Sequence, residues 1–290
     1  MVFEPHSQAQ HRQDYVRARS LAVAVAALSG AEARVLAGGT DLYPAHVGRP
    51  MPARLVDVSA VAQMRGIDVS AGTVRIGGAV TWTEIAAASL PPAFRALQAA
   101  ARQVGSIQVQ NRGTIAGNLC NASPAADGVP PLLVLDAEVE LASAGGVRRM
   151  RLADFIMGYR KTALRPGEVL SSVIVTGLGA ETRTAFVKLG ARKYLVISIV
   201  MAAALIHRDR GGAIIEACVA VGSASAKAQR LGLLERDLAR LPKGQAPSTV
   251  LRPEHFSVLQ PIDDARATAR YRLEAAWQLV ADALDQAAEG

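Results

Sequence analysis

An apolar strand runs directly into a glycine turn at residues 35–42, which read Val35-Leu36-Ala37-Gly38-Gly39-Thr40-Asp41-Leu42. Without Cβ atoms, Gly38 and Gly39 can adopt positive φ and let successive backbone N–H groups approach an anion closely. Thr40 can add a hydroxyl donor. The turn is therefore a candidate phosphate cradle, although a plain turn that needs glycines for steric reasons would have the same sequence.

A second glycine-bearing stretch occupies residues 105–131 and has no clear period of 2 or 3.6. A connection of this length inside a compact domain is more often functional than not. Gly113 and Gly117 can shape a backbone nest around phosphate, Asn118 supplies a neutral donor, and Asp127 is an acceptor suited to a ribose hydroxyl. The alternative is an ordered surface loop held by its own side chains. Together the two stretches predict a dinucleotide site without naming the nucleotide.

Short helices and strands surround these stretches. Ser20 is the expected N-cap of a helix that ends at Gly30, Thr81 and Glu84 form a capping box, and a helix follows over residues 91–105. Strands are expected at 34–37, 55–58, 73–78, 139–141, 169–175 (half-buried), 185–188, 199–206 and 217–221, and later helices at 226–238 and 264–287.

The order of these elements predicts the fold class. Runs of strands followed by helices favour an α+β protein over a doubly wound parallel sheet. A domain boundary is expected at residues 178–181, which divides the chain into residues 1–177 and 178–290.

Composition excludes several functional classes. The net charge of +7 comes from scattered arginines, and 4% aromatic residues are too few for base stacking, so no nucleic acid is expected. No apolar run reaches the roughly 18 residues of a membrane span, and no signal peptide is apparent, which predicts a cytoplasmic protein. The two cysteines form no CxxC pair, so we expect no metal or iron–sulfur site in this chain.

Catalytic signatures are also missing. The sequence has no HExxH, GxSxG or GxxxxGK[ST] motif, and no GxGxxG after a strand. None of its five histidines pairs with a cysteine or carboxylate at the spacing of a nucleophile and its base. We therefore predict no catalytic acid, base or nucleophile.

Five motifs resemble those of one family, the FAD-binding subunits of molybdenum hydroxylases such as xanthine dehydrogenase and carbon monoxide dehydrogenase. They are, in the family's order, AGGTDL, NRGTIAGNLCNASPAAD, GYRKTALRPGEVL, FVKLGARK and PIDDARATARYR. The resemblance implies a PCMH-type (vanillyl-alcohol-oxidase-like) FAD-binding domain over residues 1–177. A small α+β domain of the carbon monoxide dehydrogenase flavoprotein C-terminal type would follow over residues 178–290.

The resemblance also implies which residues bind FAD. Residues 35–42 would wrap the pyrophosphate from one side. The other implied contacts are Thr114, Ile115, Ala116, Gly117 and Asn118 on the opposite side, Asp127 at an acidic position, Leu170 near the flavin, Lys188 close to the isoalloxazine or ribityl group, and Val104 at a position that is aromatic in some relatives. Ala116 stands where glycine is commoner, which suits FAD binding only if its φ is negative.

The implied function is electron transfer. A molybdopterin-containing large subunit would oxidise the substrate, a [2Fe–2S] small subunit would relay electrons to FAD, and the complex would be a dimer of heterotrimers. A self-contained flavin oxidase and a scaffold without FAD remain alternatives. Many relatives carry aspartate shortly after the position of Arg192, but residues 193–197 (KYLVI) have none. This departure argues against NAD⁺ as acceptor, and Tyr194 could shield the flavin ring instead.

Overall fold

A small parallel sheet forms the N-terminal end of the protein. The computed structural model describes residues 14–29, 33–70, 72–192 and 196–289, so the predicted helix stop at Gly30 lies outside the described residues. Val23 N–H donates to Ser20 Oγ at 3.3 Å, which confirms the predicted N-cap. The elements are β1 (Asp14–Arg17), α1 (Leu21–Leu28), β2 (Ala33–Leu36), α2 (Leu42–Ala45) and β3 (Arg54–Asp57), and the strand order is β1-β3-β2.

A five-stranded antiparallel sheet follows, in the order β4-β5-β10-β6-β7. Its central strand β10 is buried on both faces up to Val175, so the prediction of a half-buried strand was wrong. The reason is that Leu170 and Val173 pack into the main core, whereas Val169 packs into a second cluster around α1 and the parallel sheet. These strands and the preceding 3₁₀ helix are η1 (Ala62–Met64), β4 (Ile67–Ser70), β5 (Thr73–Gly77), β6 (Glu138–Ser143), β7 (Gly146–Arg151) and β10 (Val169–Thr176).

Short helices cover this sheet, and three of them occupy the stretch that was predicted to be irregular. Each is too short to give a periodic pattern in the sequence. Two begin at capping side chains, because Ser106 Oγ accepts from Val109 N–H and Thr114 Oγ1 accepts from Gly117 N–H. The predicted capping box at Thr81 and Glu84 is confirmed. The elements are α3 (Trp82–Ala87), η2 (Pro92–Phe94), α4 (Arg95–Ala101), α5 (Ile107–Arg112), α6 (Ile115–Asn121), α7 (Val129–Val134), α8 (Leu152–Phe155) and the hairpin of β8 (Ile156–Gly158) and β9 (Lys161–Thr162).

The C-terminal part is a four-stranded antiparallel sheet in the order β11-β12-β13-β14, covered on one face by α9 and α10. The final helix begins at Ala269 rather than at residue 264, because the Asp264 carboxylate accepts the backbone N–H groups of Arg266 and Ala267 and holds a turn. The elements are β11 (Thr182–Leu189), β12 (Val200–Arg208), β13 (Ile214–Gly222), β14 (Gln229–Arg230), α9 (Gly232–Leu238), η3 (Pro247–Val250), η4 (Pro253–Phe256) and α10 (Ala269–Glu289).

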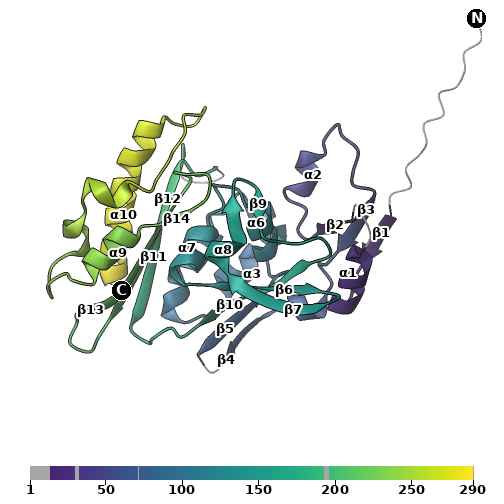
Figure 1. Cartoon of the computed structure of the whole chain (residues 1–290), viewed down its shortest axis with the longest axis horizontal. Helices are drawn as coiled ribbons and strands as arrows, with labels where there is room; N and C mark the ends of the chain where they lie inside the picture. Colours follow the sequence, from purple (N-terminus) through teal and green to yellow (C-terminus); the bar gives the residue numbers. More distant parts are fainter. Residues whose placement is uncertain (1–13, 30–32, 71, 193–195, 290) are drawn as a thin grey trace, which may run out of the picture.

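The three larger sheets lie in a row, with the parallel sheet at one end and the α10 layer at the other (Figure 1). Phe186 and Met201 of the C-terminal sheet belong to the main core beneath α4 and α7. The arrangement confirms the α+β class. The division between residues 1–177 and 178–290 falls in the link from β10 to β11 and stays a prediction. Of the helices in the described ranges, none has the length and apolar character required to cross a membrane.

Candidate functional site

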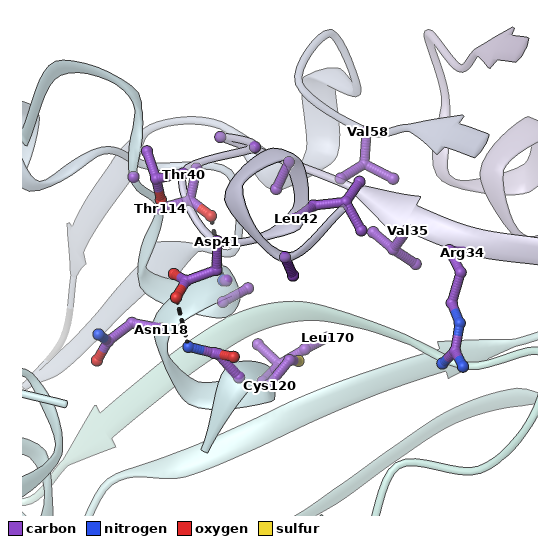
Figure 2. Close-up of a pocket in the computed structure, with 18 of the residues that line it drawn as sticks. Arg34, Val35, Thr40, Asp41, Leu42, Val58, Thr114, Asn118, Cys120 and Leu170 are labelled. Carbon is purple, nitrogen blue, oxygen red and sulfur yellow. Dashed lines mark hydrogen bonds between the residues drawn. The ribbon is translucent and has the colours of Figure 1, made fainter. Parts of the chain in front are cut away.

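A cavity of about 660 Å³ opens between the glycine turn after β2, helix α6, strand β10 and the β8–β9 hairpin (Figure 2). This volume is within the roughly 300–1,000 Å³ of small-molecule and cofactor sites. The predicted residues that line it are Val35, Ala37, Gly38, Gly39, Thr40, Asp41, Leu42, Val104, Thr114, Ala116, Gly117, Asn118 and Leu170. The fold thus gathers both glycine-bearing stretches and the middle strand of the central sheet around one space.

The glycine turn lies directly against the end of helix α5. A Cβ on Gly38 would stand 2.0 Å from the Arg112 carbonyl oxygen and 2.9 Å from Gly113 Cα, and Gly39 has a φ of +73°. Only glycine fits the first position, and the second is left-handed. The glycines therefore join the two stretches into one wall of the cavity.

The turn also presents free backbone donors. Among the described residues, no acceptor is hydrogen-bonded to the N–H groups of residues 38–41. Successive unpaired N–H groups in a turn make an anion-binding concavity. This is the arrangement expected of a phosphate cradle.

The second stretch does not form the predicted backbone nest. Ile115 N–H donates to Val80 O, Ala116 N–H to Gly78 O, and Gly117 N–H to Thr114 Oγ1. Asn118 N–H donates to Thr114 O. These four amides are therefore used within the fold, because the stretch is a helix docked on the loop before α3. Ala116 lies inside that helix and has a negative φ, which is the backbone conformation that FAD binding requires of an alanine at this position.

Side chains of the second stretch supply the polar groups instead. Asn118 Oδ1 is buried and has no hydrogen-bond partner among the described residues. Leaving such a group unpaired costs about 1–3 kcal/mol, which a ligand donor would recover. Asn121 Nδ2 donates to Asp41 Oδ1 at 2.9 Å, and both residues line the cavity. Apolar side chains form another wall of the cavity, among them Leu170, which is only 1% exposed.

Four predicted residues do not line the cavity: Leu36, Ile115, Asp127 and Lys188. The last two bind each other, with Lys188 Nζ 2.6 Å from Asp127 Oδ2 and both side chains buried. Lys188 Nζ also donates to Gln103 O at 3.0 Å, and Ser198 Oγ donates to Asp127 Oδ1 at 2.5 Å. Burial raises the pKa of the Asp127 carboxyl, and the Lys188 ammonium opposes that rise. Their predicted contacts with FAD stay predictions.

Several lining residues were missed by the sequence analysis, among them Arg34, Trp82, Cys120, Asn121 and Arg160. Burial raises the pKa of the Cys120 thiol to about 12, which disfavours the reactive thiolate. Arg160 and Asn121 both lie within motifs quoted above, but no local pattern shows that a hairpin turn at residue 160 reaches the end of α6.

Residues 8–175, more than half of the chain, match the family model described as the FAD binding domain in molybdopterin dehydrogenase. The chain is 38% identical over 183 residues to the nicotinate dehydrogenase FAD-subunit of Eubacterium barkeri, an alignment that covers 61% of this chain and 62% of that protein. It is 31% identical to the xanthine dehydrogenase FAD-binding subunit of Escherichia coli O157:H7, covering 89% of this chain and 90% of that protein.

A solved structure resembles the whole fold. Carbon monoxide dehydrogenase from Hydrogenophaga pseudoflava contains a chain that matches with a TM-score of 0.86 and 27% identity, over 95% of this chain and 97% of that one. The glycine cradle, the unpaired Asn118 oxygen and the apolar wall fit a dinucleotide that carries a flavin ring. With the family match, they show that this chain belongs to the FAD-binding subunits of the molybdenum hydroxylases, that it is an oxidoreductase subunit, and that its cofactor is FAD.

Proposed function

We propose that the chain holds FAD in this cavity and that the flavin passes electrons from a [2Fe–2S] small subunit to an external acceptor, while a molybdopterin-containing large subunit oxidises the substrate. The proposal is supported by the names of the relatives, which are FAD subunits or medium chains of dehydrogenases. It agrees with a lining in which burial disfavours the thiolate form of Cys120 and Asp41 is hydrogen-bonded to Asn121.

The observation that carries the proposal is the set of unpaired N–H groups at residues 38–41 beside an apolar wall. These donors and the Thr40 hydroxyl would bind the diphosphate. Val104 and Leu170 would exclude water and contact the flavin ring. The buried Asn118 oxygen would accept a hydrogen bond from the ligand. Each group acts by binding and orienting, and none has to move a proton.

Co-purification of the native complex tests the subunit role. Metal and flavin analysis should find molybdenum, iron and FAD together, and the native mass should match a dimer of heterotrimers. A single chain that oxidises an organic substrate without molybdenum or iron–sulfur partners would instead establish the self-contained flavin oxidase. Protein that releases no FAD when denatured would establish the scaffold.

We further propose an acceptor other than NAD⁺. The support is the sequence of residues 192–197, which has no aspartate; residues 193–195, with Tyr194, lie outside the described residues. Ile197 is 61% exposed, so this segment presents an apolar side chain to solvent. Stopped-flow mixing of the complex with NADH should give slow reduction of the flavin, and rapid reduction would overturn this part of the proposal.

A further inference from the structure

The tip of the β8–β9 hairpin is bound to the end of helix α6 in a strained arrangement. Arg160 has a φ of +50° and Ala122, the C-cap of α6, has a φ of +45°, both in the left-handed region. Arg160 N–H donates to Ala122 O at 3.0 Å, so the two strained residues are joined directly. Left-handed non-glycine residues cost on the order of 1 kcal/mol each and cluster at functional sites, where the surrounding structure fixes them.

The strained turn places a guanidinium in the cavity lining. Arg160 Nη1 donates to Asn121 Oδ1 at 2.5 Å, and Asn121 Nδ2 donates to Asp41 Oδ1 at 2.9 Å. All three residues line the cavity. Asp41 is the last residue of the turn at residues 38–41, so two hydrogen bonds connect the guanidinium to the proposed phosphate cradle.

The charges of the cavity need such a cation. Asp41 places a carboxylate beside a cradle that would hold a diphosphate, and like charges repel unless a cation lies between them. The arginines of the described lining are Arg34 and Arg160. Figure 2 shows Arg34, near the start of β2, well away from Asp41 and Asn118. Among the residues that the structure describes, Arg160 forms no ion pair, and its guanidinium carbon lies 5.9 Å from the centroid of the neighbouring Tyr159 ring, so no carboxylate neutralises its charge and it is available to a ligand.

We infer that Arg160 binds the diphosphate of FAD and that Asn121 is the positioning residue that aims its guanidinium. This inference rests on the proposed FAD site in the cavity. Arginine donates paired N–H groups to phosphate oxygens in a fixed fork, which lysine and glutamine cannot reproduce. The Asn121 carbonyl oxygen occupies one donor of the fork, and among the described residues no acceptor is hydrogen-bonded to the other guanidinium donors, which would bind the phosphate oxygens.

Ligand fragments test the inference on the full-length chain after its FAD has been removed. The dissociation constants of FAD, ADP and riboflavin are measured for the wild type, Arg160→Gln, Arg160→Lys and the matched control Lys161→Gln. Lys161 is exposed, lies outside the lining and has the same charge. Losing a charge-assisted pair should weaken FAD and ADP binding about 10–100-fold for Arg160→Gln, with a smaller loss for Arg160→Lys. Riboflavin binding and all Lys161→Gln values should stay unchanged.

Three results would overturn the inference. Equal losses for FAD and riboflavin would place the guanidinium on the flavin ring, and unchanged FAD and ADP binding would make Arg160 a purely structural link. If Asn121→Ala weakens ADP binding as strongly in the Arg160→Gln background as in the wild type, Asn121 does not act through Arg160. Arg160→Gly relieves the left-handed strain, so it replaces Arg160→Gln if that variant fails to fold.

Failure of this inference can be told from failure of the proposed site. If Gly38→Ala weakens FAD binding by at least about 30-fold while Arg160→Gln binds like the wild type, the cavity holds FAD and only the role of Arg160 is wrong. If both variants bind FAD like the wild type, FAD lies elsewhere and the proposed site itself is wrong.

Discussion

Replacing Gly38 by alanine should separate the two walls of the FAD cavity. The new Cβ would stand 2.0 Å from the Arg112 carbonyl oxygen, whereas ordinary contacts begin at 3.4 Å. The obstacle is backbone, at the end of α5, and cannot rotate away as a side chain could. The glycine turn must therefore move by about 1.4 Å relative to α5.

This displacement sets the expected losses of stability and of FAD affinity. Overpacking a well-packed interior costs about 1–3 kcal/mol, and a backbone obstacle places Gly38→Ala at the upper end. The same movement shifts the N–H donors of the cradle by more than the tolerance of a hydrogen bond. We expect the FAD affinity to fall at least about 30-fold, equivalent to about 2 kcal/mol, and the apo protein to unfold at a lower temperature.

Fluorescence titration with FAD and thermal unfolding of the apo protein measure the two effects. Gly232→Ala is the matched control, because its Cβ would lie 3.8 Å from the nearest atom, Arg236 Nη1, in helix α9. It should bind FAD like the wild type. If Gly38→Ala binds FAD within about threefold of the wild type and unfolds at the same temperature, the close approach is not needed for the site.

Three further predictions concern buried and ionised groups. Lys188→Met should cost about 3 kcal/mol of unfolding free energy in urea, because it leaves the buried Asp127 carboxyl without its cation; an unchanged midpoint would contradict this. The hydrogen bond from Arg148 lowers the pKa of Glu168 below its ordinary 4.5. The ionised Glu168 side chain therefore stabilises the fold fully above pH 4.5, and this stabilisation is lost as the pH falls through the lowered pKa. Between pH 6 and pH 3 the unfolding temperature should therefore fall more steeply for the wild type than for Glu168→Gln. Parallel curves of unfolding temperature against pH would refute this prediction. The Cys120 thiol, with a pKa of about 12, should react with DTNB at pH 8 only slowly until urea unfolds the protein.

Local signals in the sequence were sufficient for much of the fold and part of the site. Ser20, Thr81 and Glu84 cap helices as predicted, because capping depends on residues three positions apart. The glycine turn at residues 38–41 was also predicted from the sequence, because two adjacent glycines after an apolar strand are visible in the sequence itself. The five ordered motifs identified the family.

The remaining features could not be predicted from local patterns, because they depend on contacts between residues that lie far apart in the chain. Strand β10 is buried on both faces since two clusters from different parts of the chain cover it. The N–H groups of residues 115–118 donate to Thr114 and to the carbonyl oxygens of Gly78 and Val80. The spacing of residues in the sequence does not reveal these hydrogen bonds. Arg160 reaches the cradle through Asn121, 39 residues earlier, and Lys188 reaches Asp127 across 61 residues. Local residue chemistry shows which residues can cradle a phosphate, whereas packing between distant segments sets which of their donors and charges remain free to bind it.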